Sequence, residues 1–299
     1  MIDDFVKIPS AALRCILRHC GVLISTPHSS GFARLAYGAF YEAVKDRGHK
    51  IKSVTTYLVI LLIILLLFSL SSAGSFFPGE RLEFDVSWYG VSGGTLVLEV
   101  TNAVDGNNSV FKISSTVKSN SFISMFYPVN EVIESYVDIN SLQPYHYRSR
   151  LQEGSYRSDK EIIFDREKNI ATYINHKAGG KKRVMEIKEG THDPLSVVYF
   201  FRTIPLQAGQ SADIEVHDGN KSWTLVVQGV KKEKVRTPAG TFNTIKVKAL
   251  IKYEGLFVNK GDVFIWFTDD EARMPVKIES RIKIGNITAL LIGKQIKGN

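Results

Sequence analysis

Apolar and polar residues alternate with a period of two along most of the chain after residue 80. In residues 81–88 the alternation places Leu82, Phe84 and Trp88 on one face, as expected for a strand that is buried on one side. Segments with a strand-like pattern lie at 81–88, 95–101, 110–117, 131–137, 145–151, 160–164, 170–174, 183–187, 211–216, 222–230, 240–253, 262–268, 274–281 and 286–292. Gly, Asn or Asp separates many of them, and these residues favour tight turns. The pattern predicts a meander of antiparallel strands.

Residues 193–202 depart from this alternation, because their apolar residues recur at close to helical spacing. Asp193 can cap a helix, and Pro194 suits the first helical position. We therefore expect one short helix, packed against the sheet and ended before Pro205. The predicted fold class is all-β, mostly antiparallel, forming a curved sheet or a partly open barrel with one short helix.

A separate apolar segment occupies residues 54–72, with basic residues before it at positions 47, 50 and 52 and small residues at 71–73. This order is typical of a secretory signal. At ~1.5 Å per residue the segment only just crosses a hydrocarbon layer of ~30 Å, which favours cleavage over a permanent anchor. We expect residues 54–73 to be a signal peptide, with an inner-membrane anchor and membrane contact as the alternative. Residues 74–299 then form an exported, periplasmic β-rich domain.

Residues 1–53 precede this segment, although secretory signals normally begin within a few residues of their basic region. They are either a cytoplasmic tail or lie largely outside the translated product, if translation starts at Val44. We favour the later start. Detection of the tail in the native protein would contradict it.

Both cysteines, Cys15 and Cys20, fall in this N-terminal tail. The exported part therefore has neither disulfides nor a Cys-ligated metal site. Residues 1–73 hold eight basic and four acidic residues of a chain with net charge +8, so the exported part carries about +4. A charge this modest argues against nucleic acid as a partner.

Four blocks of sequence resemble the bacterial envelope proteins grouped as domain of unknown function 3108. They are PGERLEFDVSW at 78–88 with Gly90, Gly93 and Gly94; DP at 193–194 with YFFR at 199–202, Pro205, Leu206 and Gly209; TPAGTF at 237–242; and WFTDD at 266–270 with RMPVKIE at 273–279. The resemblance implies an exported, β-rich domain without an assigned activity. It supplies no catalytic residue.

The candidate reactive groups have simpler structural interpretations. His192 and Asp193 could form an acid/base couple, but we interpret them as a loop histidine beside a helix cap. Residues 269–271 (Asp-Asp-Glu) could bind a hard cation, but they lack the alternating carboxylates of a calcium loop and are interpreted as a polar hairpin tip. The histidines are scattered singly. We predict no catalytic residue, no metal site and no cofactor.

Aromatic and apolar residues supply the predicted ligand-binding residues. Residues 122–127 form an apolar loop between two strands, which could act as a lid or a membrane-touching edge. The predicted ligand-binding residues are Phe122, Met125, Phe126, Tyr127, Trp223 and Trp266.

Our leading hypothesis from the sequence is a non-enzymatic envelope protein that binds an apolar or amphiphilic ligand such as a lipid. The first alternative is a structural or assembly factor that binds another envelope protein or a glycan through exposed strand edges. The second is a hydrolase with a carboxylate pair, for example Asp193 and Glu131.

Overall fold

The structure is a computed structural model that describes residues 78–296, apart from 107, 254–255 and 283–284. The predictions for the tail at 1–53 and for the signal or anchor at 54–73 lie outside the described residues. Within the described part of the chain, no helix is long and apolar enough to span a membrane.

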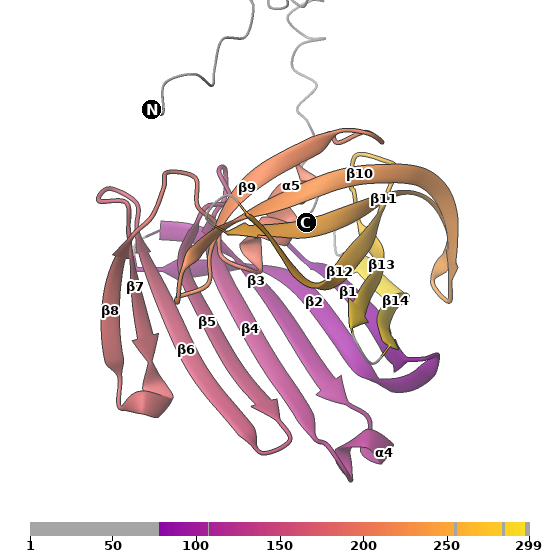
Figure 1. Cartoon of the computed structure of the whole chain (residues 1–299), viewed down its shortest axis with the longest axis horizontal. Coiled ribbons are helices and arrows are strands. Elements are labelled where there is room, and N and C mark those ends of the chain that lie inside the picture. Colours follow the sequence, from indigo (N-terminus) through magenta and orange to yellow (C-terminus); the bar gives the residue numbers. More distant parts are fainter. Residues whose placement is uncertain (1–77, 107, 254–255, 283–284, 297–299) are drawn as a thin grey trace, which may run out of the picture. The chain divides into compact units, whose positions relative to one another are not determined.

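The described residues form one 14-stranded sheet in which all neighbouring strands are antiparallel (Figure 1). The strands are β1 (Glu80–Trp88), β2 (Val91–Asp105), β3 (Asn108–Ser119), β4 (Val129–Asp138), β5 (Pro144–Glu153), β6 (Tyr156–Asp165), β7 (Ile170–Asn175), β8 (Lys181–Glu186), β9 (Ser211–His217), β10 (Ser222–Thr237), β11 (Gly240–Tyr253), β12 (Leu256–Thr268), β13 (Pro275–Ile282) and β14 (Gly285–Ile296). The predicted all-β, antiparallel fold class is confirmed.

The helical content differs from the single predicted helix. The expected helix is α5 (Ser196–Arg202), but a four-residue helix, α4 (Ser121–Ser124), and a short 3₁₀ helix, η1 (His176–Ala178), also occur. The residue before α5 is Leu195, so Pro194 precedes the helix instead of occupying its first turn.

Strand order follows the chain from β8 back to β1, continues into β14, and then runs down to β9. Hydrogen bonds between β1 and β14 therefore join the two halves of the meander into one sheet. The edges are β8 and β9, and the segment that connects them in sequence contains α5. Figure 1 shows the sheet strongly curved, with α5 beneath the arch of β9 and β10.

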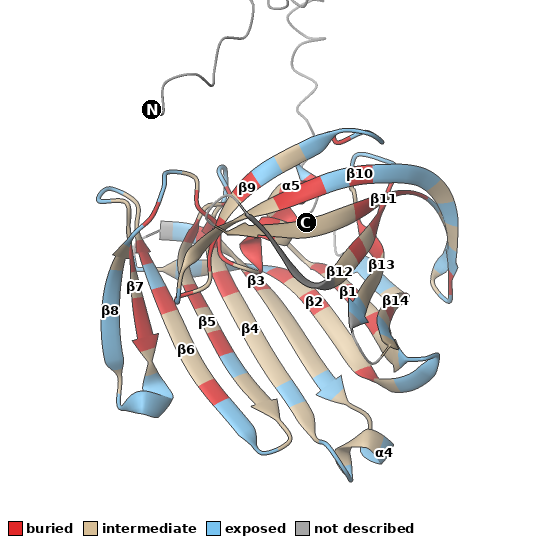
Figure 2. Cartoon of the chain, in the orientation of Figure 1, coloured by how far each residue is buried: buried red, intermediate tan, exposed pale blue. Residues whose placement is uncertain are grey.

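Helix α5 packs between the two halves of the sheet and organises their cores. Tyr199 joins the apolar cluster of β2 to β7, whereas Val197 and Phe201 join the cluster of β9 to β12. We call the face of β2 to β6 that packs against α5 the inner face. Burial along this face is concentrated near the helix (Figure 2).

A buried ion pair fastens α5 to the first strand. The Arg202 guanidinium donates to both carboxylate oxygens of Glu80, at 2.6 and 2.8 Å, and also to the Ala272 carbonyl. Both side chains are almost completely buried. The sequence blocks at 78–88, 199–202 and 273–279 thus meet here, since Arg273 also donates to the Arg202 carbonyl.

The loop between β8 and α5 contacts β9, the opposite edge strand of the sheet. His192 forms an isolated parallel bridge with Val216 of β9, in which its amide donates to Glu215 and its carbonyl accepts from His217. Arg183 of β8 donates to the Gly219 carbonyl in the turn after β9. These contacts connect the two edge strands, β8 and β9, which do not pair with each other in the sheet.

Candidate functional site

The inner face of β2 to β6 extends from α5 towards the end of the sheet that carries α4. Cross-strand register arranges its side chains in rungs. The rung nearest α5 contains Val100, Ile113, Ser135, Tyr147 and Ile162; the second contains Leu98, Ser115, Ile133, Ser149 and Lys160; the third contains Leu96, Val117, Glu131, Leu151 and Ser158; the last contains Val129, Glu153 and Tyr156.

Burial decreases from the first rung to the last. Every residue of the first rung is at most 7 % exposed, because α5 covers it. In the third rung Leu96, Val117 and Leu151 are only half-buried, and Tyr156 in the last is exposed. The inner face beyond α5 therefore offers apolar side chains that the protein itself does not fully cover.

Two carboxyl groups lie on this partly covered surface. Glu131 of β4 pairs in register with Leu151, while Glu153, two residues further along β5, pairs with Val129, so the two glutamates are diagonal neighbours. Burial, followed by a hydrogen bond to Glu153 and its negative charge, raises the pKa of Glu131 to about 7. Glu131 is consequently protonated at mildly acidic pH, so the pair can donate as well as accept a hydrogen bond.

The inner face ends at a group of exposed apolar side chains on four neighbouring hairpins. We call this group the apolar rim; its members are Trp88, Tyr89, Val91, Phe122, Met125, Phe126, Tyr127, Tyr156 and Ile287. Phe126 is the most exposed, at 76 %. Figure 2 shows the exposed strand ends around α4.

Backbone hydrogen bonds lock the hairpins of the apolar rim to one another. The Asn120 amide donates to Gly93, the Tyr89 amide to Asn286, and the Gly154 amide to Pro128. Gly154 has φ +54°, and a β-carbon there would lie 2.6 Å from the Tyr127 ring. The hairpins of the rim therefore have a fixed arrangement, and the lack of a side chain at Gly154 lets the Tyr127 ring pack closely against it.

The structure places the predicted ligand-binding residues in two settings. Phe122, Met125, Phe126 and Tyr127 lie together on the apolar rim. Trp266 is buried in a core cluster and its indole donates to Glu233, while Trp223 packs against the cluster of β9 to β12. These two tryptophans therefore belong to the core and not to the rim.

Sequence reasoning missed other members of the rim. Trp88 was expected on the buried face of its strand, but the register of β1 and β2 shifts between Val86 and Ser87, and Trp88 is 51 % exposed. The run Trp88, Tyr89 and Val91 at a turn was the available signal, because turns otherwise favour polar residues.

His192 and Asp193, which we interpreted as a loop histidine beside a helix cap, lie in the turn before α5. Asp193 accepts from the amides of Leu195 and Ser196 at 2.7 and 2.8 Å, and from the Ser135 hydroxyl. Burial raises the pKa of Asp193, and burial together with the charge of Arg166 lowers the pKa of His192 to about 4. Asp193 does not meet Glu131, which lies two rungs away, roughly 13 Å along β4.

Other polar groups also have local partners. Asp270 accepts from the Thr268 hydroxyl, and Asp269 pairs with Lys232 at 2.8 Å. His146 and His176, separate in sequence, meet on opposite oxygens of Glu161. No group of three or more potential metal ligands is found in the described residues.

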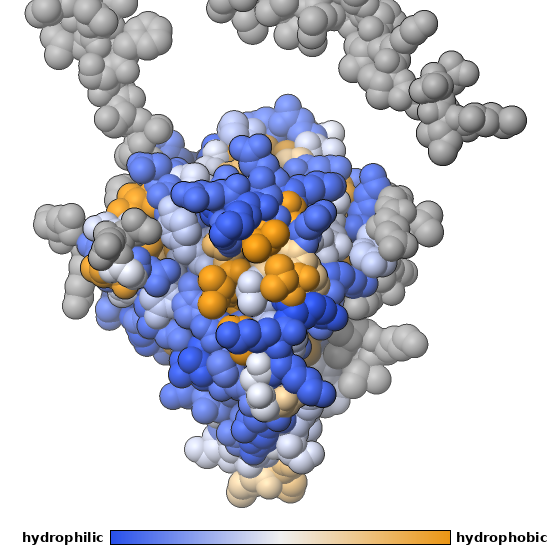
Figure 3. Space-filling view, turned by 90° about the vertical axis from the view of Figure 1, so that its left-hand side faces the viewer, coloured by the Kyte–Doolittle hydropathy of each residue, from blue (hydrophilic) through white to orange (hydrophobic). Residues whose placement is uncertain are grey.

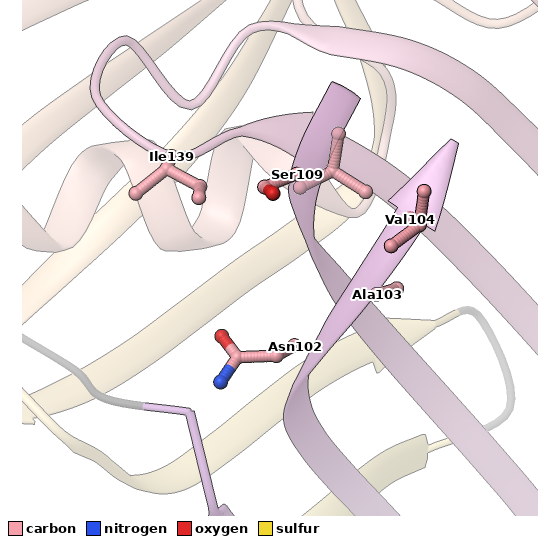
Figure 4. A pocket seen from close by; sticks show the side chains of 6 residues that line it. Asn102, Ala103, Val104, Ser109 and Ile139 are labelled. Carbon is pink, nitrogen blue, oxygen red and sulfur yellow. The ribbon is translucent and has the colours of Figure 1, made fainter. Parts of the chain in front are cut away.

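Two surface pockets flank the sheet. One of about 360 Å³ lies at the opposite end of β2, lined by Asn102, Ala103, Val104, Ser109, Val110 and Ile139 (Figure 4). The other, of about 420 Å³, lies beside the apolar rim and is lined by Asn130, Val132, Arg150, Leu151, Gln152, Arg157, Ser158, Asp159 and Lys177. The first has no charged side chain in its lining, whereas the second is rich in cations.

A smaller exposed apolar group lies on the outer surface near the edge strand β8. Ile163 and Val184 are both exposed, and each pairs in register with Thr172 between them. Figure 3, viewed from the side of β8, shows apolar side chains ringed by hydrophilic ones.

Comparison with solved structures shows the fold alone. A crystal structure of a β-barrel-like protein of domain of unknown function DUF1849 from Brucella abortus is similar, with a TM-score of 0.50 and 10 % identity over 75 % of this chain and 100 % of that one. A "putative lipoprotein" from Parabacteroides distasonis shares 12 % identity over 74 % of this chain and 98 % of that one, with a TM-score of 0.32.

Comparison of sequences gives one family. The profile described as "Protein of unknown function (DUF3108)" matches residues 83–292. No curated protein matches the chain.

Proposed function

Because the chain belongs to the DUF3108 family, which has no assigned activity, we propose a function from the geometry: the protein is a non-enzymatic binder of an apolar or amphiphilic ligand such as a lipid. The ligand's apolar chain lies on the inner face beyond α5, against Leu96, Val117 and Leu151. Its polar end lies near Glu131 and Glu153.

The observation that carries this proposal is the continuity between the partly covered inner face and the apolar rim. Core burial should be greatest in the middle of a sheet face, yet here the half-buried apolar side chains of the third rung lead to nine exposed large apolar side chains. Single exposed apolar residues are ordinary, but a contiguous group marks a site of interaction. A lipid chain would cover the inner rungs as α5 covers the first one.

The chemistry of the polar groups supports binding over catalysis. His192 and Asp193 are buried and engaged in the turn before α5. The carboxyl pair lies among apolar side chains, where the proton on Glu131 lets it bind a hydroxyl or an amine. The apolar segment at 54–73 in the sequence supports export to the cell envelope, where amphiphiles are abundant.

The test is lipid capture by the full chain expressed in a bacterial host and recovered from its envelope. Native mass spectrometry should show a complex with added lipid mass. Val117→Asn, on the inner face, should weaken binding of the fluorescent fatty acid cis-parinaric acid by roughly tenfold. The matched control is Val132→Asn, also half-buried but on the outer face of β4, which should leave binding unchanged. Equal effects of the two variants, or no saturable binding, would contradict the proposal.

A second function, as an assembly factor that binds an envelope protein, is favoured by β8. This edge strand is exposed at five of its six residues, and one of them is the apolar Val184. It could receive a partner strand, although its lysines oppose uncontrolled edge pairing. A photo-crosslinker at Val184 should then capture one stoichiometric protein. No adduct would exclude this role for β8.

A further inference from the structure

The apolar rim carries chemistry that the inner face does not explain. Its most exposed side chains lie on the hairpins beyond the last rung and cannot all contact a ligand held against the inner rungs. Phe126, Met125 and Tyr89 are each at least 70 % exposed. Such an arrangement needs a large apolar partner outside the molecule.

Cations lie beside the rim on the side of β3, β5 and β6. The 420 Å³ pocket beside it contains Arg150, Arg157 and Lys177. Glu134 neutralises Arg150, but Arg157 donates only to the carbonyls of Gly154 and Tyr156, and no ion pair engages Lys177 in the described part of the chain. Lys118 is likewise exposed at the end of β3. The surface next to the rim therefore has positive charge that complements an anionic surface.

Trp and Tyr next to Lys and Arg are the residues that favour the boundary between lipid chains and headgroups. Their rings are amphipathic, and the cations attract anionic headgroups. A soluble protein partner would not require both features side by side. The backbone hydrogen bonds between the hairpins also mean that the rim can insert as a preformed unit, without an ordering cost for each loop.

We propose that the apolar rim docks on a phospholipid bilayer that contains anionic headgroups. The aromatic side chains of Trp88, Phe122 and Phe126 enter the interfacial layer, and Arg157 and Lys177 contact headgroup phosphates. The open end of the inner face then meets the bilayer surface. This inference goes beyond ligand capture, because docking can occur whether or not the inner face holds a lipid.

The rim lies at the end of β1 that is far from the point where the chain enters the domain. Strand β1 begins at Glu80 and ends at Trp88, so the chain enters the domain roughly 30 Å from the rim. The rim and the start of the first strand therefore lie at opposite ends of β1.

The experiment uses the full chain as recovered from the envelope and measures its tryptophan emission. The vesicles contain brominated phosphatidylcholine, which quenches tryptophan, and about 30 % phosphatidylglycerol, so that about one lipid in three is anionic. Trp88 should be quenched, and Trp88→Phe should abolish the response, because Trp266 is buried and Trp223 packs against the cluster of β9 to β12, away from the rim. Phe122→Ser combined with Phe126→Ser should remove quenching of Trp88. The matched control, Val104→Ser with Val184→Ser, changes equally exposed apolar residues elsewhere and should retain it.

Charge is tested separately. Arg157→Gln with Lys177→Gln should weaken binding to the anionic vesicles by roughly thirty-fold, and should have little effect on vesicles of phosphatidylcholine alone. Urea midpoints of all variants should equal that of the parent, which excludes misfolding as the cause.

The outcomes separate docking from ligand capture. If neither the anionic vesicles nor those of phosphatidylcholine alone quench Trp88, while cis-parinaric acid still binds, the docking proposal is overturned. The rim would then be a surface for a protein partner. Quenching of Trp88 without any captured lipid supports docking and rejects the proposed ligand site.

Discussion

The two ends of the inner face use side chains in opposite ways. At the α5 end, charged and polar groups are buried: Glu80 pairs with Arg202, and Asp193 accepts three hydrogen bonds. At the rim end, large apolar side chains are exposed. Buried polar groups must find partners to avoid a large free-energy cost, and here they fix α5 against both halves of the sheet.

Exposed apolar groups have no corresponding role in stability. A side chain such as Phe126, at 76 % exposed, loses little contact with water when the chain folds. The α5 end therefore accounts for the fold, whereas the rim end needs a partner. The comparison predicts that substitutions at the α5 end change the free energy of unfolding and that those of the exposed apolar side chains of the rim change binding.

Glu80→Gln should produce the largest effect. It leaves the Arg202 guanidinium buried without its counter-charge, and removal of one member of a buried ion pair costs about 3–5 kcal/mol. The free energy of unfolding, measured by urea titration, should fall by this amount. The double variant Glu80→Leu with Arg202→Met should recover most of the loss, since it removes both charges. A small loss for Glu80→Gln would mean that the Ala272 carbonyl alone can satisfy Arg202.

Gly154→Ala should have a smaller effect, at the rim end. Gly154 has φ +54°, and an added β-carbon would press on the Tyr127 ring. Left-handed backbone costs an alanine about 1 kcal/mol, and displacement of the ring should add about as much. Gly106→Ala is the matched control, because Gly106 has φ +60° with no atom within 4 Å of the added β-carbon.

The difference between the two glycine variants, read from their urea midpoints, isolates the contact with Tyr127. Equal losses would show that the ring moves aside at no cost. The rim would then be looser than its backbone hydrogen bonds indicate.

The sequence predicted the fold well, because antiparallel strands with one buried face leave a period-two pattern. The strand boundaries were less accurate: β10 continues to Thr237, beyond the predicted 230, since the basic residues 231–236 alternate on an exposed hairpin. The junction of β1 with β14 could not be foreseen, because pairing between distant strands leaves no local signal.

The candidate site was predicted only where its residues are consecutive. The loop at 122–127 was visible as an apolar run, but the pairing of Glu131 with Glu153 depends on the register of β4 and β5. Trp266 was misplaced because a large aromatic residue suits a core as well as a binding surface. The role of the sequence blocks around Glu80 and Arg202 likewise emerged only when the fold brought them together.

The smallest effect concerns pH, and it distinguishes the two ends by sign. At the α5 end, the pKa of His192 is lowered from 6.5 to about 4, so the unfolded chain binds the extra proton and stability falls as pH falls through this window. At the rim end, the pKa of Glu131 is raised from 4.5 to about 7, so the folded chain holds the extra proton and stability falls as pH rises through that window. Glu131→Gln should therefore remove the loss between pH 4.5 and 7, which solvent screening of this half-buried group limits to about 1 kcal/mol, and leave the acid-side loss from His192 intact. Urea titrations at intervals of one pH unit check both halves of this expectation. An unchanged profile in Glu131→Gln would show that Glu131 holds no extra proton in the folded chain, and would remove the hydrogen-bond donor that we assign to the ligand's polar end.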